Sequence, residues 1–217
     1  MDQTFTFKDN METLPIFNLN FYKFTCEDAL TDQVLEIAKK SKWLKNGSNE
    51  ISADDLFFHP ELHDWFDKCI LSVKEKIGLP NAVDLPITSC WVNKSVKLNG
   101  HLDHAHPNSV ISGVFYLSSH QSGATVFSAP NYWLKDPLHF QWANQLPESY
   151  QAKILPVKST LILFPSHLWH SVLGLKENET RYTVSFNTYL SGEIDDDRHR
   201  TRLYLKSKSV RDWHNEK

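Results

Sequence analysis

Four side chains that could bind a metal lie within six residues of one another. They are His101, Asp103, His104 and His106. Neutral imidazole and carboxylate are common protein ligands of iron, zinc, nickel and copper, so this density of ligands indicates a metal site. Side chains two residues apart on a β-strand point to the same face, so His104 and His106 could reach one ion together.

A second pair of histidines, His167 and His170, follows the very apolar segment 161–165. An apolar strand that ends at these residues would deliver an imidazole to the interior of a barrel. We therefore expect His104, His106 and His170 to hold one iron ion. Three protein ligands on one side of the ion would leave its other positions open for a co-substrate and O₂.

Arg181 lies eleven residues after His170 and opens the strand-like segment 181–187. We expect this strand to be the next antiparallel neighbour of the strand that carries His170, so that Arg181 points into the same cavity. A guanidinium there would bind a carboxylate through two hydrogen bonds and would stay charged at any working pH. An arginine at a strand end is more often a surface residue, and the three histidines are what favour the carboxylate-binding interpretation.

The composition is that of a globular chain with one domain. The 217 residues are 41% hydrophobic and 12% aromatic, enough to bury a core without disulfides. A formal net charge of −3 gives no electrostatic case for nucleic acid as a bulk partner. Three scattered cysteines without CxxC spacing favour a reducing compartment. Because we see no signal-peptide pattern and no membrane-length apolar run, we expect a cytoplasmic protein without membrane contact.

The first third of the chain has mostly helical periodicity. Apolar residues recur at helical spacing in 26–44 and in 59–80, which predicts two amphipathic helices, the second ending at Gly78. The better strand candidate before them is 17–25, and the polar segment 45–55 is predicted to be a loop.

From residue 86 the pattern changes to strands. Segments rich in β-branched and aromatic residues predict a barrel or sandwich backed by helices. The aromatic segment 131–150 is expected to be an excursion over the barrel mouth, with 132–142 as a substrate lid or a surface cover. The tail, 191–217, is expected to be a solvated terminal strand or helix. The strand-like segments are 87–98, 109–117, 123–130, 152–165 and 181–190.

Four of these segments together resemble the iron(II)- and 2-oxoglutarate-dependent oxygenase superfamily. The segments are HAHPNSVISGVFYL, GATVF, FPSHLWHSV and RYTVSFN. They are most similar to a small branch in which the first ligand pair is His-x-His, whereas most members of the superfamily have His-x-Asp or His-x-Glu. The resemblance covers about residues 91–189.

The resemblance implies a mainly β fold with helices (α+β), a double-stranded β-helix or jelly roll backed by N-terminal helices. It implies one domain, with supporting elements in 1–85, the jelly-roll core in 86–190 and a tail in 191–217. It also implies Fe(II) as the metal and 2-oxoglutarate as the co-substrate. The activity would be a hydroxylase-type oxidation of a substrate, with release of succinate and CO₂.

By the same resemblance, the iron ligands are His104, His106 and His170. Arg181 would pair with the distal carboxylate of 2-oxoglutarate, with Thr183 beside it as the hydroxyl partner. No catalytic residue is expected beyond the metal site.

Three further candidates for co-substrate binding come from spacing and strand position. Asn93 precedes His104 by eleven residues, a spacing similar to that of a co-substrate-binding asparagine in the alkylated-base demethylase branch. Tyr116 and Ser112 lie on the strand after the ligand pair, where alternation with Val114 would turn them to one side.

An alternative first ligand pair is also present, because His101 and Asp103 spell a literal His-x-Asp. We prefer His104 and His106, which sit next to the Pro-Asn-Ser turn and keep the spacing to Asn93. On a regular strand Asp103 would point to the opposite face, which a bulge could reverse.

Two other functional classes stay open at this point. One is a three-histidine metal dioxygenase that uses no 2-oxoglutarate, and the other is a catalytically inactive, cupin-like binding module. Arg181 distinguishes a 2-oxoglutarate-dependent enzyme from the first of these classes, because that class needs no residue that binds a co-substrate carboxylate. The sequence names neither the primary substrate nor the oligomeric state, a homo-oligomer included.

Overall fold

The computed structural model describes residues 19–46, 49–96, 100–129, 151–195 and 202–216, and the account of the fold refers to these. Two antiparallel sheets form the body of the molecule. The larger has seven strands in the order β1-β10-β7-β12-β5-β3-β2. Its strands are β1 (Tyr22–Thr25), β2 (Trp43–Asn46), β3 (Asn49–Ser52), β5 (Ile87–Val96), β7 (Ile111–Tyr116), β10 (Thr160–Pro165) and β12 (Thr180–Thr188).

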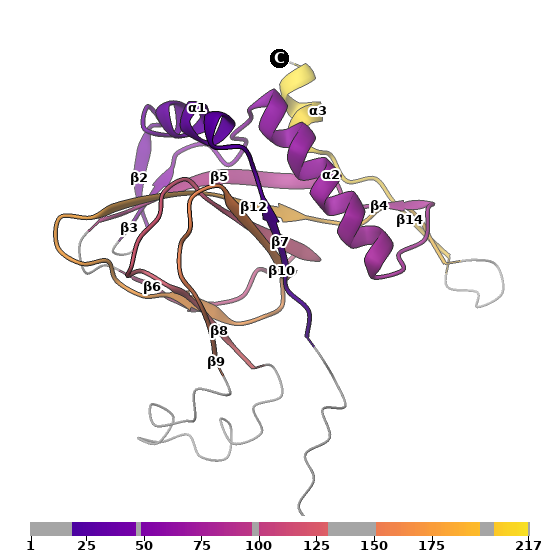
Figure 1. Cartoon of the computed structure of the whole chain (residues 1–217). Coiled ribbons are helices and arrows are strands. Elements are labelled where there is room, and N and C mark those ends of the chain that lie inside the picture. The colour runs from indigo at the N-terminus through magenta and orange to yellow at the C-terminus, as the bar shows by residue number, and fades with distance from the viewer. Residues whose placement is uncertain (1–18, 47–48, 97–99, 130–150, 196–201, 217) are drawn as a thin grey trace, which may run out of the picture.

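The smaller sheet has four strands and lies across the large sheet from helices α1 and α2 (Figure 1). Its order is β6-β11-β8-β9, with every neighbouring pair antiparallel. The two sheets together form the expected double-stranded β-helix, and this prediction is confirmed. The strands are β6 (His101–His104), β8 (Thr125–Ser128), β9 (Gln151–Ile154) and β11 (His170–Val172).

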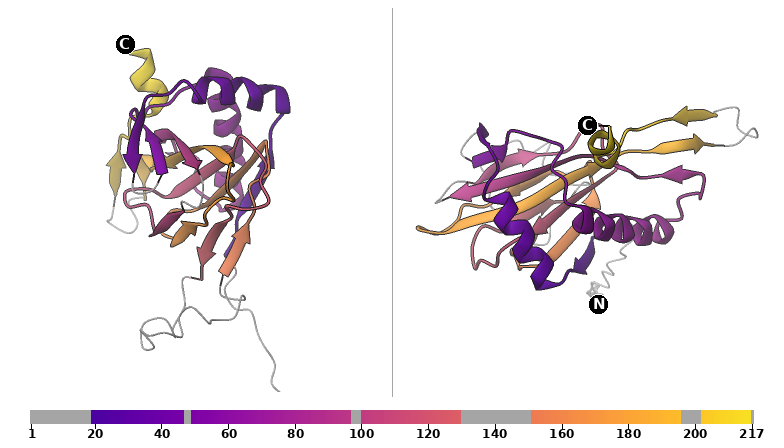
Figure 2. Two further views of the ribbon diagram at one scale, coloured as in Figure 1. Left: turned by 90° about the vertical axis from the view of Figure 1, so that its left-hand side faces the viewer. Right: turned by 90° about the horizontal axis from the view of Figure 1, so that it is seen from above.

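Helices α1 (Asp28–Ala38) and α2 (Pro60–Lys76) cover the outer face of the large sheet (Figures 1 and 2). The start of α2 is fixed by His59, whose side chain accepts from Leu62 N, and by a proline in the first turn. Gly78, with φ of +72°, follows its end, as expected for a helix C-terminus. No helix in the described ranges is long and apolar enough to cross a membrane.

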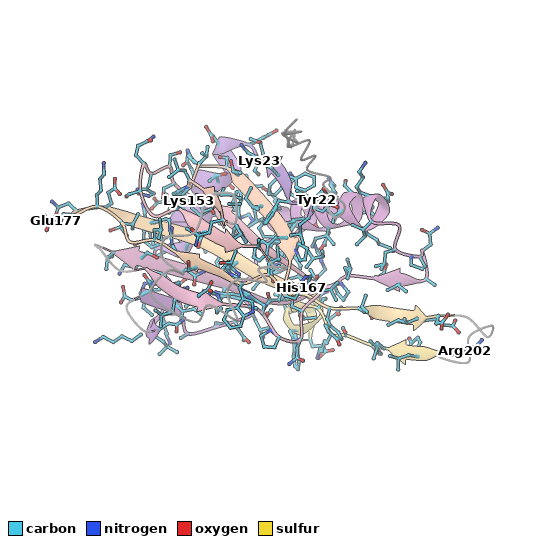
Figure 3. The ribbon with its side chains drawn as sticks, turned by 90° about the horizontal axis from the view of Figure 1, so that it is seen from below. Tyr22, Lys23, Lys153, His167, Glu177 and Arg202 are labelled. Atoms are coloured by element: carbon cyan, nitrogen blue, oxygen red, sulfur yellow. The ribbon has the colours of Figure 1, made fainter. Side chains whose placement is uncertain are left out.

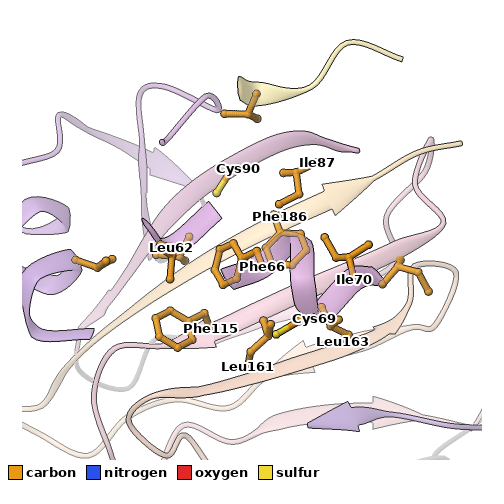
Figure 4. Close-up of a cluster of buried hydrophobic side chains, with 14 of the residues drawn as sticks. Leu62, Phe66, Cys69, Ile70, Ile87, Cys90, Phe115, Leu161, Leu163 and Phe186 are labelled. Carbon is orange, nitrogen blue, oxygen red and sulfur yellow. The ribbon is translucent and has the colours of Figure 1, made fainter. Parts of the chain in front are cut away.

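The core lies between α2 and the large sheet (Figure 4). The ring of Phe66 on α2 lies 4.6 Å from that of Phe186 on β12 and 5.7 Å from that of Phe115 on β7, measured between centroids. All three side chains are fully buried. Removal of apolar side chains from water is the main term that stabilises a folded domain, and it contributes about 25 cal/mol per Å² of apolar area buried.

The prediction of a polar loop at 45–55 is wrong. Strands β2 and β3 pair with each other there, and β3 continues the large sheet by pairing with β5. The segment is polar because the pair lies at the edge of the sheet. In sequence, Asn46 and Gly47 form an Asn-Gly dipeptide, which is typical of tight hairpin turns, and Asn46 at the end of β2 pairs with Asn49 at the start of β3.

The tail forms more structure than a solvated strand or helix. Strands β13 (Ser191–Ile194) and β14 (Leu203–Leu205) join β4 (Val83–Asp84) in a third sheet. In Figure 3, Arg202 lies at the far end of this ribbon and Glu177 at the opposite end of the molecule. The final helix, α3 (Val210–Asn215), buries Val210 completely in the main core, so the tail contributes to the same core as α2.

The predicted strand segment 152–165 is two strands in different sheets, β9 in the smaller sheet and β10 in the larger. Most other predicted elements are shorter than their segments, whereas β12 begins one residue before its segment. α1 is capped by Glu27 without a side-chain hydrogen bond to the helix. The segment 131–150, including the predicted lid at 132–142, lies outside the described residues.

Candidate metal centre

The imidazoles of His104, His106 and His170 converge on one point. Their potential ligand atoms all lie within 4.8 Å of one another. Nε2 of His106 lies 3.2 Å from Nε2 of His170, and the rings of His104 and His170 are 4.3 Å apart between centroids. Two nitrogen ligands about 2.1 Å from one ion and at right angles to each other would be about 3.0 Å apart. The 3.2 Å between Nε2 of His106 and Nε2 of His170 is therefore the spacing that a shared metal ion requires.

Backbone carbonyls set the tautomer of two of these rings. Nδ1 of His104 lies 2.8 Å from the carbonyl oxygen of Leu102, and Nδ1 of His170 lies 2.9 Å from that of Leu168. A carbonyl oxygen only accepts, so each Nδ1 carries the proton and each Nε2 keeps its lone pair. Orientation of a ligand imidazole through its other nitrogen is the usual arrangement in metal sites.

The third imidazole, that of His106, is held differently. It lies two residues beyond the end of β6, so the expectation that it shares a strand face with His104 is wrong. The backbone N–H of His106 donates to the carbonyl of Ser166 at 2.9 Å. Its imidazole hydrogen bonds with the side chain of Asn187. The Trp91 ring stacks on it at 5.9 Å between centroids, with 22° between the planes.

Burial keeps two of the three imidazoles neutral. Desolvation, with the nearby His170 and His104 as smaller causes, lowers the pKa of His106 to about 4, although a hydrogen bond with Asn187 opposes the shift. Desolvation likewise lowers the pKa of His170 to about 4. At neutral pH both rings therefore carry free lone pairs, which is the state that binds a metal.

A β-bulge decides how the alternative pair is placed. His170 pairs with His104 and Val172 pairs with His101, so two residues of β6 oppose Ser171 alone. The extra residue turns both His101 and His104 toward the cavity between the sheets. Leu102 and Asp103, between them, are exposed, with Leu102 at 88%. His101 thus lines the cavity, whereas Asp103 does not join the three converging imidazoles.

The cavity runs between the two sheets from the three imidazoles to Arg181 and has a volume of about 60 Å³. Asn93, Tyr116 and Thr183 also line it. Ser112 does not. Its hydroxyl lies 2.8 Å from both Ser166 Oγ and Asn187 Oδ1, in a hydrogen-bonded group beside the cavity.

Arg181 reaches the cavity from an unexpected side. Its strand, β12, belongs to the large sheet and pairs with β5 and β7, so it is not the antiparallel neighbour of β11 that the sequence suggested. The reason is the jelly-roll connection, which carries the chain from the small sheet at His170 to the large sheet. Arg181 therefore faces the imidazoles across the space between the sheets.

The guanidinium of Arg181 is only partly satisfied. It is 4% exposed, and it donates through Nη1 to the Gly123 carbonyl and through Nη2 to Ser95 Oγ at 3.2 Å. Its buried Nε has no hydrogen-bond partner, and no carboxylate of the described residues pairs with it. Burial lowers its pKa. A buried cation with unused donors is matched to an anionic ligand such as a dicarboxylate.

The remaining candidates form one row across three strands. Thr183 is the direct partner of Asn93 on β5 and of Tyr116 on β7. The Tyr116 hydroxyl lies 2.8 Å from Thr125 Oγ1, across to the small sheet, and burial raises the pKa of Tyr116. A polar wall thus extends beside Arg181.

Sequence reasoning missed three residues of this wall: Trp91, Ser95 and Ser185. All three sit two residues from an identified candidate, on the same strand face. Polar or aromatic residues at every second position of otherwise apolar strands were the available signal.

Comparison with known proteins bears on this site. Residues 89–187 match the family model described as putative 2OG-Fe(II) oxygenase. A search of curated proteins found no match.

Among the solved structures that share the fold are the following three. A prolyl-4-hydroxylase from Pseudomonas putida is 13% identical, with a TM-score of 0.57 over 79% of this chain and 92% of that one. HygX from Streptomyces hygroscopicus, solved with nickel and 2-oxoglutarate bound, is 12% identical, with a TM-score of 0.61 over 89% and 94%. The non-heme alpha ketoglutarate dependent epimerase SnoN from nogalamycin biosynthesis is 11% identical, with a TM-score of 0.62 over 88% and 90%.

Proposed function

Because residues 89–187 match the family model of the 2OG-Fe(II) oxygenases, we propose that His104, His106 and His170 bind Fe(II) and that Arg181 binds 2-oxoglutarate. The chain is a 2-oxoglutarate-dependent non-haem iron oxygenase, and the residue roles are what we add. The single observation that carries them is one cavity with three converging imidazoles at one end and a buried, partly unsatisfied guanidinium at the other.

When bound, Fe(II) with 2-oxoglutarate and O₂ supplies the oxidising power that modifies the primary substrate and releases succinate and CO₂. The protein's own residues bind and orient these groups. His104, His106 and His170 present neutral nitrogens, and backbone carbonyls fix two of the rings. Arg181 holds a carboxylate without competition from an acidic side chain of the described chain.

The site is open to a substrate on one side. A groove outside the metal centre is lined by Ile51, Trp91, His101 and Leu102 together with His104 and His106. A substrate lying there would place its reactive atom next to the imidazoles while Arg181 stays deep in the cavity. We propose that the chain folds as one domain around this site, since α3 shares the core of α2.

Turnover of 2-oxoglutarate without the primary substrate tests the proposal. Iron-loaded wild-type protein should release succinate, and His170→Ala should reduce the release to the background of metal in buffer. His167→Ala is the matched control, because His167 is exposed three residues before His170 and its substitution should leave the release unchanged. His101→Ala should retain bound iron if the alternative pair plays no part.

The outcomes separate the remaining classes. Loss of succinate release in His170→Ala but not in His167→Ala supports the proposed ligands. Iron binding without any 2-oxoglutarate turnover in the wild type would contradict the role of Arg181. Failure to bind iron would contradict the metal site itself.

A further inference from the structure

Trp91 connects the metal centre with the polar wall of the cavity. It lies on β5, facing the cavity, and its ring stacks on His106. Its indole Nε1–H donates to Oδ1 of Asn93 at 3.1 Å. One side chain therefore touches both an iron ligand and a residue of the co-substrate wall.

The Trp91 indole determines the orientation of the Asn93 side-chain amide. An indole N–H is a donor only, so the atom of Asn93 that faces it must be the oxygen. The two amide hydrogens then point the other way, with Nδ2 2.9 Å from Ser185 Oγ and 3.4 Å from Thr183 Oγ1. The amide turned by 180° would place two donors against each other at Trp91.

The direction of these bonds decides what the two hydroxyls can do. Because the Nδ2 hydrogens are donated to them, the oxygens of Thr183 and Ser185 act as acceptors and keep their own protons available. The structure gives neither proton an acceptor among the described residues. Both side chains line the same cavity as Arg181, so their protons can be directed into it.

We propose that Trp91 is a positioning residue that orients Asn93, so that Thr183 and Ser185 offer hydroxyl protons to the 2-oxoglutarate held by Arg181. The inference rests on the proposed function and adds Trp91 and Ser185 to its residues. Trp91 touches no carboxylate in this arrangement and acts through Asn93. Each further hydrogen-bond donor that points at a dicarboxylate beside the guanidinium should raise its affinity, because hydrogen bonds to charged groups are stronger than those between neutral groups.

Trp91→Phe separates the indole N–H from the ring. A phenyl ring keeps a surface for stacking on His106 but cannot donate to Asn93. We expect the variant to bind 2-oxoglutarate about tenfold more weakly, about 1.4 kcal/mol. Its affinity for Mn(II), used as a redox-stable probe of the iron site, should change by less than about twofold because the stack remains. Trp213→Phe, on α3, is the matched control and should change neither constant.

A double-mutant cycle tests whether Trp91 acts through Asn93. Dissociation constants for 2-oxoglutarate are measured by calorimetry on Mn(II)-loaded wild type, Trp91→Phe, Asn93→Ala and the double variant. In the Asn93→Ala background, Trp91→Phe should add less than about a twofold loss. An equal tenfold loss in both backgrounds would show that Trp91 acts by packing and would overturn the proposal.

A second readout needs no co-substrate. The Trp91 indole N–H resonance of the metal-free protein should shift upfield in Asn93→Ala, because a hydrogen-bonded proton loses its acceptor, and an unshifted resonance would overturn the proposal. Failure of the wild type to bind 2-oxoglutarate would overturn the proposed function and this inference with it. Normal wild-type binding that is unchanged in Trp91→Phe would overturn the inference alone.

Discussion

Along β12, Val184 and Phe186 face helix α2 and are fully buried among apolar side chains, whereas Arg181, Thr183 and Ser185 face the small sheet and line the cavity. All five residues belong to one strand, and successive side chains along it point to opposite faces. On the helix side both side chains belong to the apolar core. On the cavity side, a guanidinium nitrogen and two hydroxyl protons have no partner among the described residues.

The difference separates residues that stabilise the fold from residues that bind ligands. A buried polar group without a partner costs stability, so a sheet selected only for stability would not keep one. The cavity face keeps several, and they surround the space between the three imidazoles and Arg181. Substitutions on the helix face should therefore change unfolding, and substitutions on the cavity face should change ligand binding.

The largest effect is expected on the helix face. Phe186→Ala removes a ring that packs against Phe66 and should lower the free energy of unfolding by about 3–5 kcal/mol. Urea denaturation measures it. Leu71→Ala, at an exposed position of α2, is the control and should stay within about 0.5 kcal/mol. A loss below about 1 kcal/mol for Phe186→Ala would contradict the division between the faces.

Arg181→Met tests the cavity face. The buried guanidinium has no carboxylate partner among the described residues, so an apolar side chain of similar length should leave the free energy of unfolding unchanged or higher. The affinity for 2-oxoglutarate should fall about 100-fold, about 2.7 kcal/mol, in calorimetry on Mn(II)-loaded protein. Clear destabilisation with normal 2-oxoglutarate binding would assign Arg181 to the fold.

Gly113→Ala tests the point where β7 lies closest to the helix-facing ring. A Cβ at Gly113 would lie 2.3 Å from a ring carbon of Phe186, which forces the ring or the strand to move. Overpacking of this kind should cost about 1–3 kcal/mol, read from the denaturation midpoint. A variant as stable as the wild type would mean that Phe186 has room to shift.

The smallest effect, taken per pH unit, concerns His63, a buried histidine of α2. Burial lowers its pKa from 6.5 to about 4. The unfolded chain therefore binds a proton that the folded chain refuses, and stability falls as the pH drops from 6.5 toward 4. The slope for one such group is at most about 1.4 kcal/mol per pH unit. His63→Leu should flatten the dependence on pH, and an unchanged slope would show that other groups cause it.

The sequence predicted the parts of the fold that follow from periodicity. Helix α2 and strands β7, β10 and β12 have dense apolar residues at the spacing of their element, because one face of each lies in the core. The polar hairpin of β2 and β3 was missed because an edge pair buries little and shows little apolar alternation.

The site was predictable as a set of residue types and less so as geometry. The sequence named His104, His106 and His170, and the structure brings them together. It could not show the bulge between His101 and His104, because a bulge depends on pairing with a distant strand. For the same reason it missed Trp91 and Ser185, whose roles depend on the register of β5 against β12.

The central claim is that one cavity holds the metal at its three imidazoles and the co-substrate at its guanidinium. A crystal structure of the protein loaded with Mn(II) and 2-oxoglutarate without O₂ tests it most directly. We predict one ion bound by Nε2 of His104, His106 and His170, with a carboxylate of 2-oxoglutarate on Arg181. An ion held instead by His101 and Asp103, or 2-oxoglutarate bound away from Arg181, would contradict the account.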